Sequence, residues 1–167
     1  DIQELQRKGK LLPKLVRQSE KHCESDGNTI HCGDFFSDTT VIAADFDFVI
    51  GNPPWKSLEG SRATAETWCK NHGRPIANRQ LAIAFIWKAA LQLRDGGRIC
   101  FVLPHGVLFN HQDKAIEFQK AWLEQHAVDV VLNLADMRFN LFEAAVAPSL
   151  IVRYRKCPPT VRDHRIK

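Results

Sequence analysis

The sequence predicts an α/β domain built on a mostly parallel sheet. Short apolar runs typical of buried strands alternate with longer segments whose apolar residues recur at helical spacing, and glycine or proline separates them. Such alternation indicates parallel strands joined by right-handed helical crossovers. With 167 residues, 44% of them hydrophobic, the chain has enough apolar material for one domain with its own core.

The first half of the chain predicts two strands and a long insert. Residues 1–28 form a polar N-terminal segment. Residues 29–32 predict a short strand leading into Gly33-Asp34, and Phe46–Ile50 predicts a second strand. Residues 56–78 carry two glycines and one proline among many polar side chains, so we expect a long loop there. Loops of that length in compact domains are usually functional or disordered.

After the insert, the sequence predicts a helix followed by a strand. Residues 79–94 predict a helix that Asp95-Gly96-Gly97 ends, because glycine readily takes the left-handed cap conformation. Arg98–Leu103 predicts a buried strand, and Pro104 stops it. The apolar spacing along the helix places Trp87 in the core.

A second helix and two more strands complete the pattern. Residues 111–126 predict an amphipathic helix with Asn110 as its N-cap, and Trp122 is expected in the core. Ala127–Leu132 and Ser149–Tyr154 predict the fourth and fifth strands.

Three chemically reactive or polar turns directly follow predicted strands: Gly33-Asp34, residues 51–55 and Pro104-His105. Ligands of open α/β sheets bind beyond the carboxyl ends of the strands. We therefore expect these turns to meet at one edge of the sheet. His105 could reach a site there, although a structural or solvent-facing histidine is the favoured interpretation.

Residues 51–55 read Gly-Asn-Pro-Pro-Trp. Each proline fixes its own φ and holds the preceding residue extended, so the chain leaves the strand along a rigid path. That path can direct two acceptors, the Asn52 carboxamide oxygen and the Pro53 carbonyl oxygen, into one space beside the face of Trp55. An amino group on an aromatic ring fits this arrangement, because its N–H bonds meet the acceptors while the ring stacks. The alternative is a strand-ending turn with a buried tryptophan, and these residues alone favour neither.

Charge and cysteine content favour an intracellular protein. The net charge of +4 permits a polyanionic partner, although the basic residues gather near the two ends, where solvated termini are the simpler interpretation. Five cysteines without a Cys-x-x-Cys pair indicate a reduced protein rather than a disulfide framework, and their spacing with histidine fits no common zinc site. The polar start is unlike a signal peptide, and no apolar run is long enough to span a bilayer.

Four basic residues in or beside the insert could meet phosphates or be solvated: Arg62, Lys70, Arg74 and Arg79.

Asn52-Pro53-Pro54-Trp55, after an apolar strand preceded by acidic residues, resembles the catalytic motif of S-adenosylmethionine-dependent DNA adenine-N6 methyltransferases. The usual form of that motif ends in Tyr or Phe. Gly33-Asp34-Phe35-Phe36 is similar to the family's earlier acidic motif. Residues 80–85 with residues 96–104 are similar to the helix, Gly-Gly turn and strand that follow, and residues 140–152 are similar to the family's late aromatic segment.

The resemblance implies a role for each of these motifs. It implies that Asp34 binds the adenine amine of the cofactor, that Phe35 packs on the adenine ring and that Phe85 lies near it. It also implies that Phe142, with Phe139 as the alternative, covers the far face of an extruded base. The residues with an implied catalytic role are Asn52, Pro53, Pro54 and Trp55.

The resemblance further implies a partial Rossmann-like class I methyltransferase fold over residues 29–155, followed by a basic tail at residues 156–167. The implied substrate is an adenine flipped out of double-stranded DNA, the cofactor is S-adenosylmethionine, and no metal is needed. Among subgroups the chain most resembles the large, cytoplasmic restriction-modification methyltransferases, in which a separate target-recognition domain helps to read the site.

One departure from the family concerns the cofactor. The family's Gly-rich loop after the first strand and its acidic residue after the second have no match in residues 1–28. We therefore expect a fragment with exposed sheet edges that binds cofactor weakly on its own and is inactive. The alternatives are an RNA adenine or protein glutamine methyltransferase, and a non-catalytic nucleic-acid-binding or assembly module of the same fold.

Overall fold

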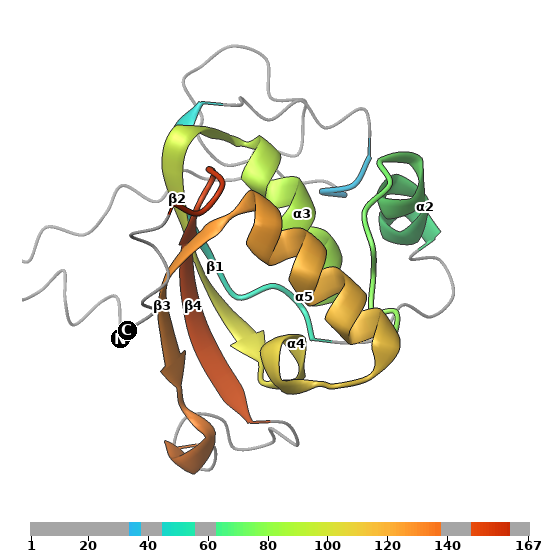
Figure 1. Ribbon diagram of the computed structural model, residues 1–167. Coiled ribbons are helices and arrows are strands. Elements are labelled where there is room, and N and C mark those ends of the chain that lie inside the picture. The colour runs from blue at the N-terminus through green and yellow to red at the C-terminus, as the bar shows by residue number, and fades with distance from the viewer. Residues whose placement is uncertain (1–33, 38–44, 56–62, 138–147, 161–167) are drawn as a thin grey trace, which may run out of the picture. The chain divides into compact units, whose positions relative to one another are not determined.

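The chain divides into two compact units, Asp1–Phe35 and Phe36–Lys167, and every helix and strand below belongs to the second unit. The computed structural model describes four segments, residues 34–37, 45–55, 63–137 and 148–160 (Figure 1). The elements in chain order are β1 (Phe46–Gly51), α2 (Ala63–Asn71), α3 (Leu81–Leu91), β2 (Leu93–Pro104), α4 (Gly106–Phe109), α5 (Asp113–Gln125), β3 (Ala127–Asn133), the short 3-10 helix η2 (Ala135–Met137) and β4 (Ser149–Arg155).

The four strands form one sheet in the order β1-β2-β4-β3. β1 runs parallel to β2, and β4 runs antiparallel to both of its neighbours. β3 therefore points the same way as β1 and β2. The prediction of an α/β fold is confirmed. The described sheet is mixed, because the reversed strand β4 makes two of its three strand pairings antiparallel.

Helices α3 and α5 cover the same face of the sheet (Figure 1). Tyr154 of β4 joins them, because its hydroxyl donates to the Ile86 carbonyl of α3 at 3.1 Å and its ring lies 5.0 Å from the Trp122 ring of α5. Trp87 and Trp122 are 2% and 0% exposed, so their predicted core positions are confirmed. Burial raises the pKa of Tyr154 well above its usual value.

Among the described helices, not one has the length and apolar character of a membrane span.

The opposite face of the sheet bears exposed apolar side chains. Phe48 and Ile50 of the edge strand β1 are 60% and 81% exposed, and Leu132 of β3 is 49% exposed. The strand registers place all three on the face that is turned away from Tyr154.

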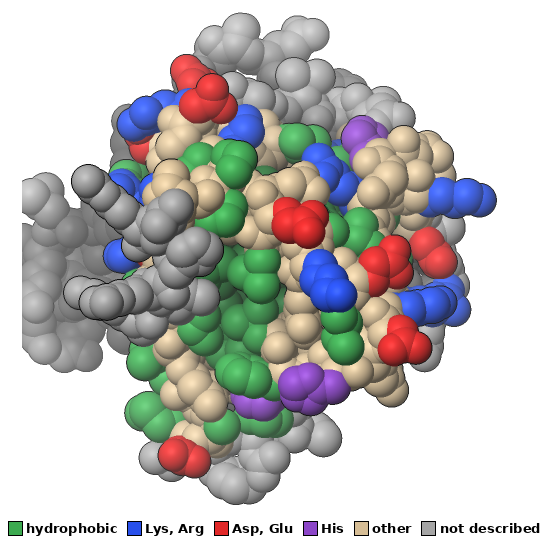
Figure 2. All heavy atoms as spheres, in the orientation of Figure 1, with side chains coloured by type: hydrophobic (Ala, Val, Ile, Leu, Met, Phe, Trp, Pro, Cys, Tyr) green, Lys and Arg blue, Asp and Glu red, His purple; other side chains and the backbone are tan. Residues whose placement is uncertain are grey.

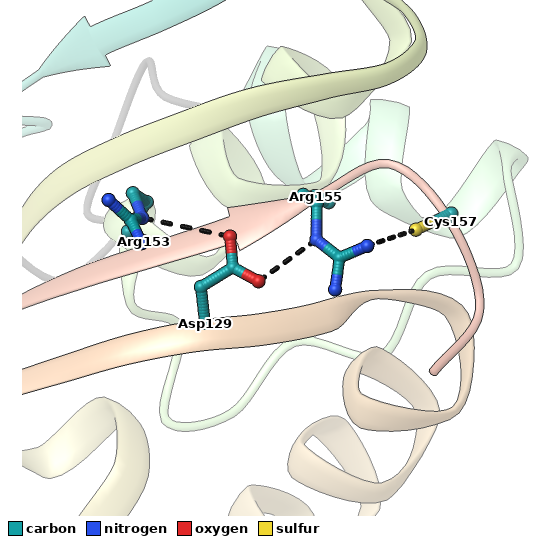
Figure 3. Close-up of polar contacts among 4 residues, drawn as sticks. All are labelled: Asp129, Arg153, Arg155 and Cys157. Carbon is teal, nitrogen blue, oxygen red and sulfur yellow. Dashed lines mark hydrogen bonds and ion pairs between the residues drawn. The ribbon is translucent and has the colours of Figure 1, made fainter. Parts of the chain in front are cut away.

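A carboxylate between two arginines joins β3 to β4 (Figure 3). Asp129 Oδ1 accepts from Arg155 Nε at 2.9 Å, and Asp129 Oδ2 lies 3.6 Å from Arg153 Nε. The Arg155 guanidinium also donates to Cys157 Sγ at 3.7 Å. The Asp129 side chain is only 18% exposed, so the pair is partly shielded from solvent.

The insert is not a continuous loop, and that prediction is wrong for residues 63–71. Helix α2 buries Ala65, Trp68 and Cys69 at helical spacing, and its Trp68 ring lies 6.0 Å from the Phe36 ring. Burial raises the pKa of the Cys69 thiol to about 11. The helix has only nine residues, and the polar positions between its three apolar contacts obscure the period in the sequence.

The predicted boundary between α3 and β2 is also wrong. Helix α3 ends at Leu91, and β2 already begins at Leu93, so Asp95-Gly96-Gly97 lies within the strand. The cause is pairing with distant segments: Phe46 N donates to Gln92 O at 3.0 Å, and Lys156 N donates to Gly97 O at 3.0 Å. These partners outweigh the local signal for a glycine cap.

The remaining predicted elements differ little from those observed. Helix α5 has Gln112 rather than Asn110 at its N-cap, although Asn110 Oδ1 accepts from the Gln112 N–H at 3.0 Å and so supports the start of the helix. The strands predicted at Ala127 and Ser149 are confirmed and extend one residue further than expected. The strand predicted at residues 29–32 lies outside the described residues.

Candidate functional site

Two of the three predicted turns lie at the same edge of the sheet. β1 and β2 are parallel neighbours with Gly51 opposite Phe101, so residues 51–55 leave β1 beside the end of β2 at Pro104. The side chain of Trp55 confirms this proximity, because its indole Nε1 donates to the Val102 carbonyl of β2 at 3.4 Å. The structure does not determine where the third turn lies relative to these two. Gly33 is outside the described residues, and the exposed Asp34 belongs to the first unit.

The turn exposes some residues of the candidate motif and buries others. Asn52 and Pro54 are exposed, Pro53 is buried, and Trp55 is half-buried. A Cβ atom at Gly51 would lie 3.2 Å from Phe101 Cε1, so glycine allows β1 to end in close contact with that ring. The carboxamide of Asn52 is therefore presented to solvent from a backbone that is packed against β2.

Asn52 and Trp55 are hydrogen-bonded to each other. The indole Nε1 of Trp55 donates to Asn52 Oδ1 at 3.1 Å, in addition to its longer bond to Val102 O. An indole nitrogen can only donate, so the carboxamide atom that faces it is the oxygen. The Asn52 oxygen has two lone pairs, and one of them is still directed away from the indole.

Phe85 of α3 lies in an aromatic cluster with Phe36, a residue to which the motif resemblance gave no role. The Phe36 ring packs edge-on against Phe85 with 5.0 Å between centroids, and Lys88 Nζ lies 5.5 Å from the Phe36 centroid. The family resemblance implied a cofactor contact for Phe35 instead, which is half-buried and belongs to the first unit. Two adjacent phenylalanines after an acidic residue give no local signal that distinguishes one from the other. Phe142 and Phe139 lie outside the described residues.

The basic residues of the insert are partly engaged within the protein. Arg79 Nη2 lies 3.4 Å from Glu66 Oε2, and the Arg74 guanidinium lies 4.8 Å from the Trp87 ring and donates to Gln125. Lys70 is exposed, and Arg62 lies outside the described residues. On the face drawn in Figure 2, hydrophobic side chains gather near the middle, and acidic and basic side chains mix around them. The described part of that face therefore has no single sign of charge.

His105 follows β2 at the same edge. Its ring stacks on Phe109 with 4.3 Å between centroids, and its backbone N–H donates to Pro148 O at 2.8 Å. This packing agrees with the favoured interpretation of His105 as a structural residue.

Comparison with protein families gives a match over most of the chain. Residues 1–141 match the model of the Eco57I restriction-modification methylase family. The chain belongs to this family. The edge of the sheet that carries Asn52 and Trp55 thus belongs to a chain of a restriction-modification methylase family, and this agrees with the resemblance of their motif to DNA methyltransferases.

Solved structures agree with this assignment of the Eco57I-family chain. It is similar to the type I restriction-modification methyltransferase subunit from Streptococcus thermophilus, with 27% identity and a TM-score of 0.58 over 74% of this chain and 26% of that one. The M protein of the type I restriction enzyme EcoKI is similar in fold, with 19% identity and a TM-score of 0.56 over 81% of this chain and 26% of that one. The Type ISP enzyme LlaBIII, solved bound to DNA, is similar in fold with 16% identity and a TM-score of 0.50 over 71% of this chain and 10% of that one.

The Eco57I-family chain therefore spans 26% or less of the length of each of these solved proteins. Its sheet matches part of the class I methyltransferase fold, which confirms the fold class predicted from the sequence. The search of curated proteins gave no match.

Proposed function

We propose that the protein containing this chain transfers a methyl group from S-adenosylmethionine to the N6 amine of an adenine flipped out of duplex DNA. One observation carries this proposal. The exposed carboxamide of Asn52 stands at the carboxyl end of β1, beside Pro53 and Trp55, in a chain of a restriction-modification methylase family.

The chemistry of an aromatic amine explains why this geometry is suitable. The nitrogen lone pair of the adenine amine is delocalised into the ring, so the amine is a poor nucleophile. The Asn52 carboxamide oxygen and the Pro53 carbonyl oxygen accept its two N–H bonds, which holds the nitrogen in position and stabilises the positive charge that develops on it. Trp55 offers the stacking face for the base. Bound S-adenosylmethionine would supply the sulfonium-activated methyl group, so that the N–C bond would form as the S–C bond breaks and the amine would release its extra proton to water.

The cofactor supplies an activated methyl group on sulfur, and this chain offers aromatic surface for its adenine ring. Phe85 is half-buried in α3, and its ring packs edge-on against Phe36. In this proposal Asp34 binds the adenine amine of the cofactor and Phe35 packs on its ring, as the family motif implies. Phe142 covers the second face of the flipped adenine. Double-stranded DNA is the proposed macromolecular partner, which agrees with the DNA-bound state of the similar enzyme LlaBIII.

Residues 1–167 alone are proposed to bind S-adenosylmethionine weakly and to transfer no methyl group. The support is the lack of a Gly-rich turn after a strand in residues 1–28. Calorimetry on the isolated chain tests this part of the proposal, and tight binding of the cofactor would contradict it.

The decisive experiment uses the full-length protein that carries this chain. Purified protein is incubated with isotopically labelled S-adenosylmethionine and duplex DNA, and the nucleosides are then separated and identified by mass spectrometry. We expect the label in N6-methyl-2′-deoxyadenosine from the DNA, and we expect Asn52→Ala to abolish it while cofactor binding persists. Asn71→Ala is the matched control, since Asn71 is an exposed asparagine at the end of α2.

Parallel incubations with RNA and with protein substrates separate the alternatives. Label in RNA adenine or in a glutamine amide would overturn the DNA assignment, although it would keep a planar amine as the substrate of Asn52. DNA binding without methyl transfer to any of these substrates would favour a non-catalytic module. Near-normal turnover by Asn52→Ala would show that Asn52 has no catalytic role.

A further inference from the structure

Trp55 differs chemically from the aromatic residue expected at its position. The motif that this turn resembles usually ends in Tyr or Phe, and neither side chain carries an N–H group on its ring. Trp55 does, and its Nε1–H group is directed at Asn52 Oδ1 at 3.1 Å and at Val102 O at 3.4 Å. The position at which a stacking ring is expected therefore also supplies a hydrogen-bond donor.

The bond to Asn52 determines which end of the carboxamide is held in place. Asparagine has an acceptor at Oδ1 and two donors at Nδ2, and a flip of the amide exchanges them. A substrate amine donates its N–H bonds and needs an acceptor. A flipped Asn52 would place its two Nδ2 donors opposite the donors of the amine. The indole N–H disfavours the flipped orientation, since it would then point at the Nδ2 donors.

The second bond connects this pair to the sheet. Val102 is half-buried in β2. The residue before it in this strand, Phe101, is paired with Gly51 at the start of the turn. The indole thus bridges the exposed Asn52 side chain to the strand that also fixes the backbone of the turn. An exposed asparagine would otherwise rotate freely about its side-chain bonds.

We propose that Trp55 is a positioning residue for Asn52 as well as a stacking surface. Its indole N–H fixes the carboxamide so that one lone pair of Oδ1 is held by Trp55 and the other is directed at the substrate amine. This inference rests on the proposed function, in which Asn52 is the acceptor for the amine. It assigns the tryptophan a task that phenylalanine cannot perform at the same position.

Two variants of the full-length protein separate the N–H group from the ring. Trp55→Phe keeps an aromatic face and removes the donor. Replacement of Trp55 by benzothienylalanine keeps the bicyclic shape and substitutes sulfur for the N–H group. We expect kcat to fall about tenfold in both, because a mobile acceptor is correctly oriented for only part of the time. The KM for DNA should change by less than about twofold, since the stacking face remains.

Unchanged kcat in the benzothienylalanine protein would overturn the proposal, because only the N–H group has been lost. A fall in kcat confined to Trp55→Phe would do the same, since ring size and not the donor would then be responsible.

A spectroscopic measurement tests the hydrogen bond between Trp55 and Asn52 without requiring methyl transfer. The full-length protein is labelled with the heavy nitrogen isotope at tryptophan, and the indole N–H resonance of Trp55 is assigned from its loss in Trp55→Phe. Asn52→Ala should move this resonance toward the position of a weakly bonded indole and should speed its exchange with water. The Trp87 indole, which donates to Pro75 O at 3.0 Å, should not move.

Asn71→Ala is the control for both readouts and should leave the Trp55 resonance unchanged. If Asn52→Ala also leaves it unchanged, the hydrogen bond does not exist in solution and the proposal fails. If the wild-type protein transfers no methyl group while Asn52→Ala moves the resonance, the proposed function fails and the contact between the two side chains stands.

Discussion

Gly97 of β2 lies directly against the backbone of Phe46 in β1. A Cβ atom at Gly97 would lie 2.9 Å from the Phe46 carbonyl oxygen and 2.9 Å from the Arg94 carbonyl oxygen. Neither atom can move without displacing a strand. This contact sets how closely β1 approaches β2, and β1 leads directly into the turn that carries Asn52.

Gly97→Ala is therefore expected to reduce the free energy of unfolding by about 2 kcal/mol, as overpacking against a fixed backbone usually does. Urea denaturation followed by circular dichroism measures the change. Gly106→Ala is the matched control, because the nearest atom to a Cβ there is Gln80 Nε2 at 3.9 Å, and it should be neutral or slightly stabilising. Equal stability of Gly97→Ala and Gly106→Ala would show that the strands separate easily at this point.

His126 gives the folded protein a pH dependence. Burial lowers the pKa of His126 below its usual value of 6.5, and the hydrogen bond to the Trp122 carbonyl opposes this only in part. Well above pH 6.5 His126 is neutral in both the folded and the unfolded state, so it gives the free energy of unfolding no pH dependence there. As the pH falls below 6.5, the unfolded state binds a proton that the folded state does not, and stability is lost.

We expect His126→Phe, which keeps an aromatic ring, to flatten this loss of stability between about pH 6.5 and pH 5. Urea midpoints measured at several pH values provide the comparison. His111→Ala, at an exposed histidine, serves as the control and should retain the slope of the wild type. A slope that persists unchanged in His126→Phe would assign the pH dependence to other groups.

The ion pair of Asp129 should stabilise the protein more than an exposed pair does. Asp129 lies between Arg153 and Arg155 (Figure 3) and is 18% exposed. Asp47, which pairs with Arg94, is 61% exposed. Asp129→Asn is expected to cost about 1 kcal/mol, and Asp47→Asn close to nothing, because solvent screens the exposed pair. Thermal unfolding at low and high salt tests both, and similar losses in the two variants would contradict the role of burial.

Cys69 should resist thiol reagents in the folded protein. Burial raises its pKa to about 11, so very little of the reactive thiolate forms near neutral pH. Iodoacetamide labelling followed by peptide mass spectrometry should modify Cys157, which is half-buried, long before Cys69. After unfolding in urea both should react at similar rates. Rapid labelling of Cys69 without denaturant would indicate that α2 opens readily.

Trp55→Ala in the full-length protein should weaken capture of the flipped base by about 1–3 kcal/mol, which is the usual contribution of stacking for one base. The measurement is binding to a DNA that the protein methylates, with a fluorescent adenine analogue at the target position. Trp55→Phe retains a stacking face and should bind nearly as well as the wild type. Equal capture by Trp55→Ala would show that the base does not stack on this residue.

The mixed sheet illustrates what local pattern could and could not predict. The strands at Phe46, Ala127 and Ser149 were predictable because each is an apolar run bounded by residues that end strands. The start of β2 was not, because Gly96-Gly97 resembles a helix cap, and only pairing with Phe46 and Lys156, which are distant in the chain, makes this segment part of a strand. Helix α2 was missed because three buried positions in nine residues give too weak a period.

The sequence by itself determined the chemistry of the candidate site: an asparagine, two prolines and a tryptophan after a strand, in an order that indicates an acceptor for an aromatic amine. The identity of these residues and the stiffness of proline are local properties, so they can be read without a fold. Only the tertiary structure decided that Phe36 packs against Phe85, that β2 begins at Leu93, and that the Trp55 indole joins Asn52 to Val102. Each of these depends on a contact between segments far apart in the chain or on the direction of a side chain, and no local pattern of residues specifies either.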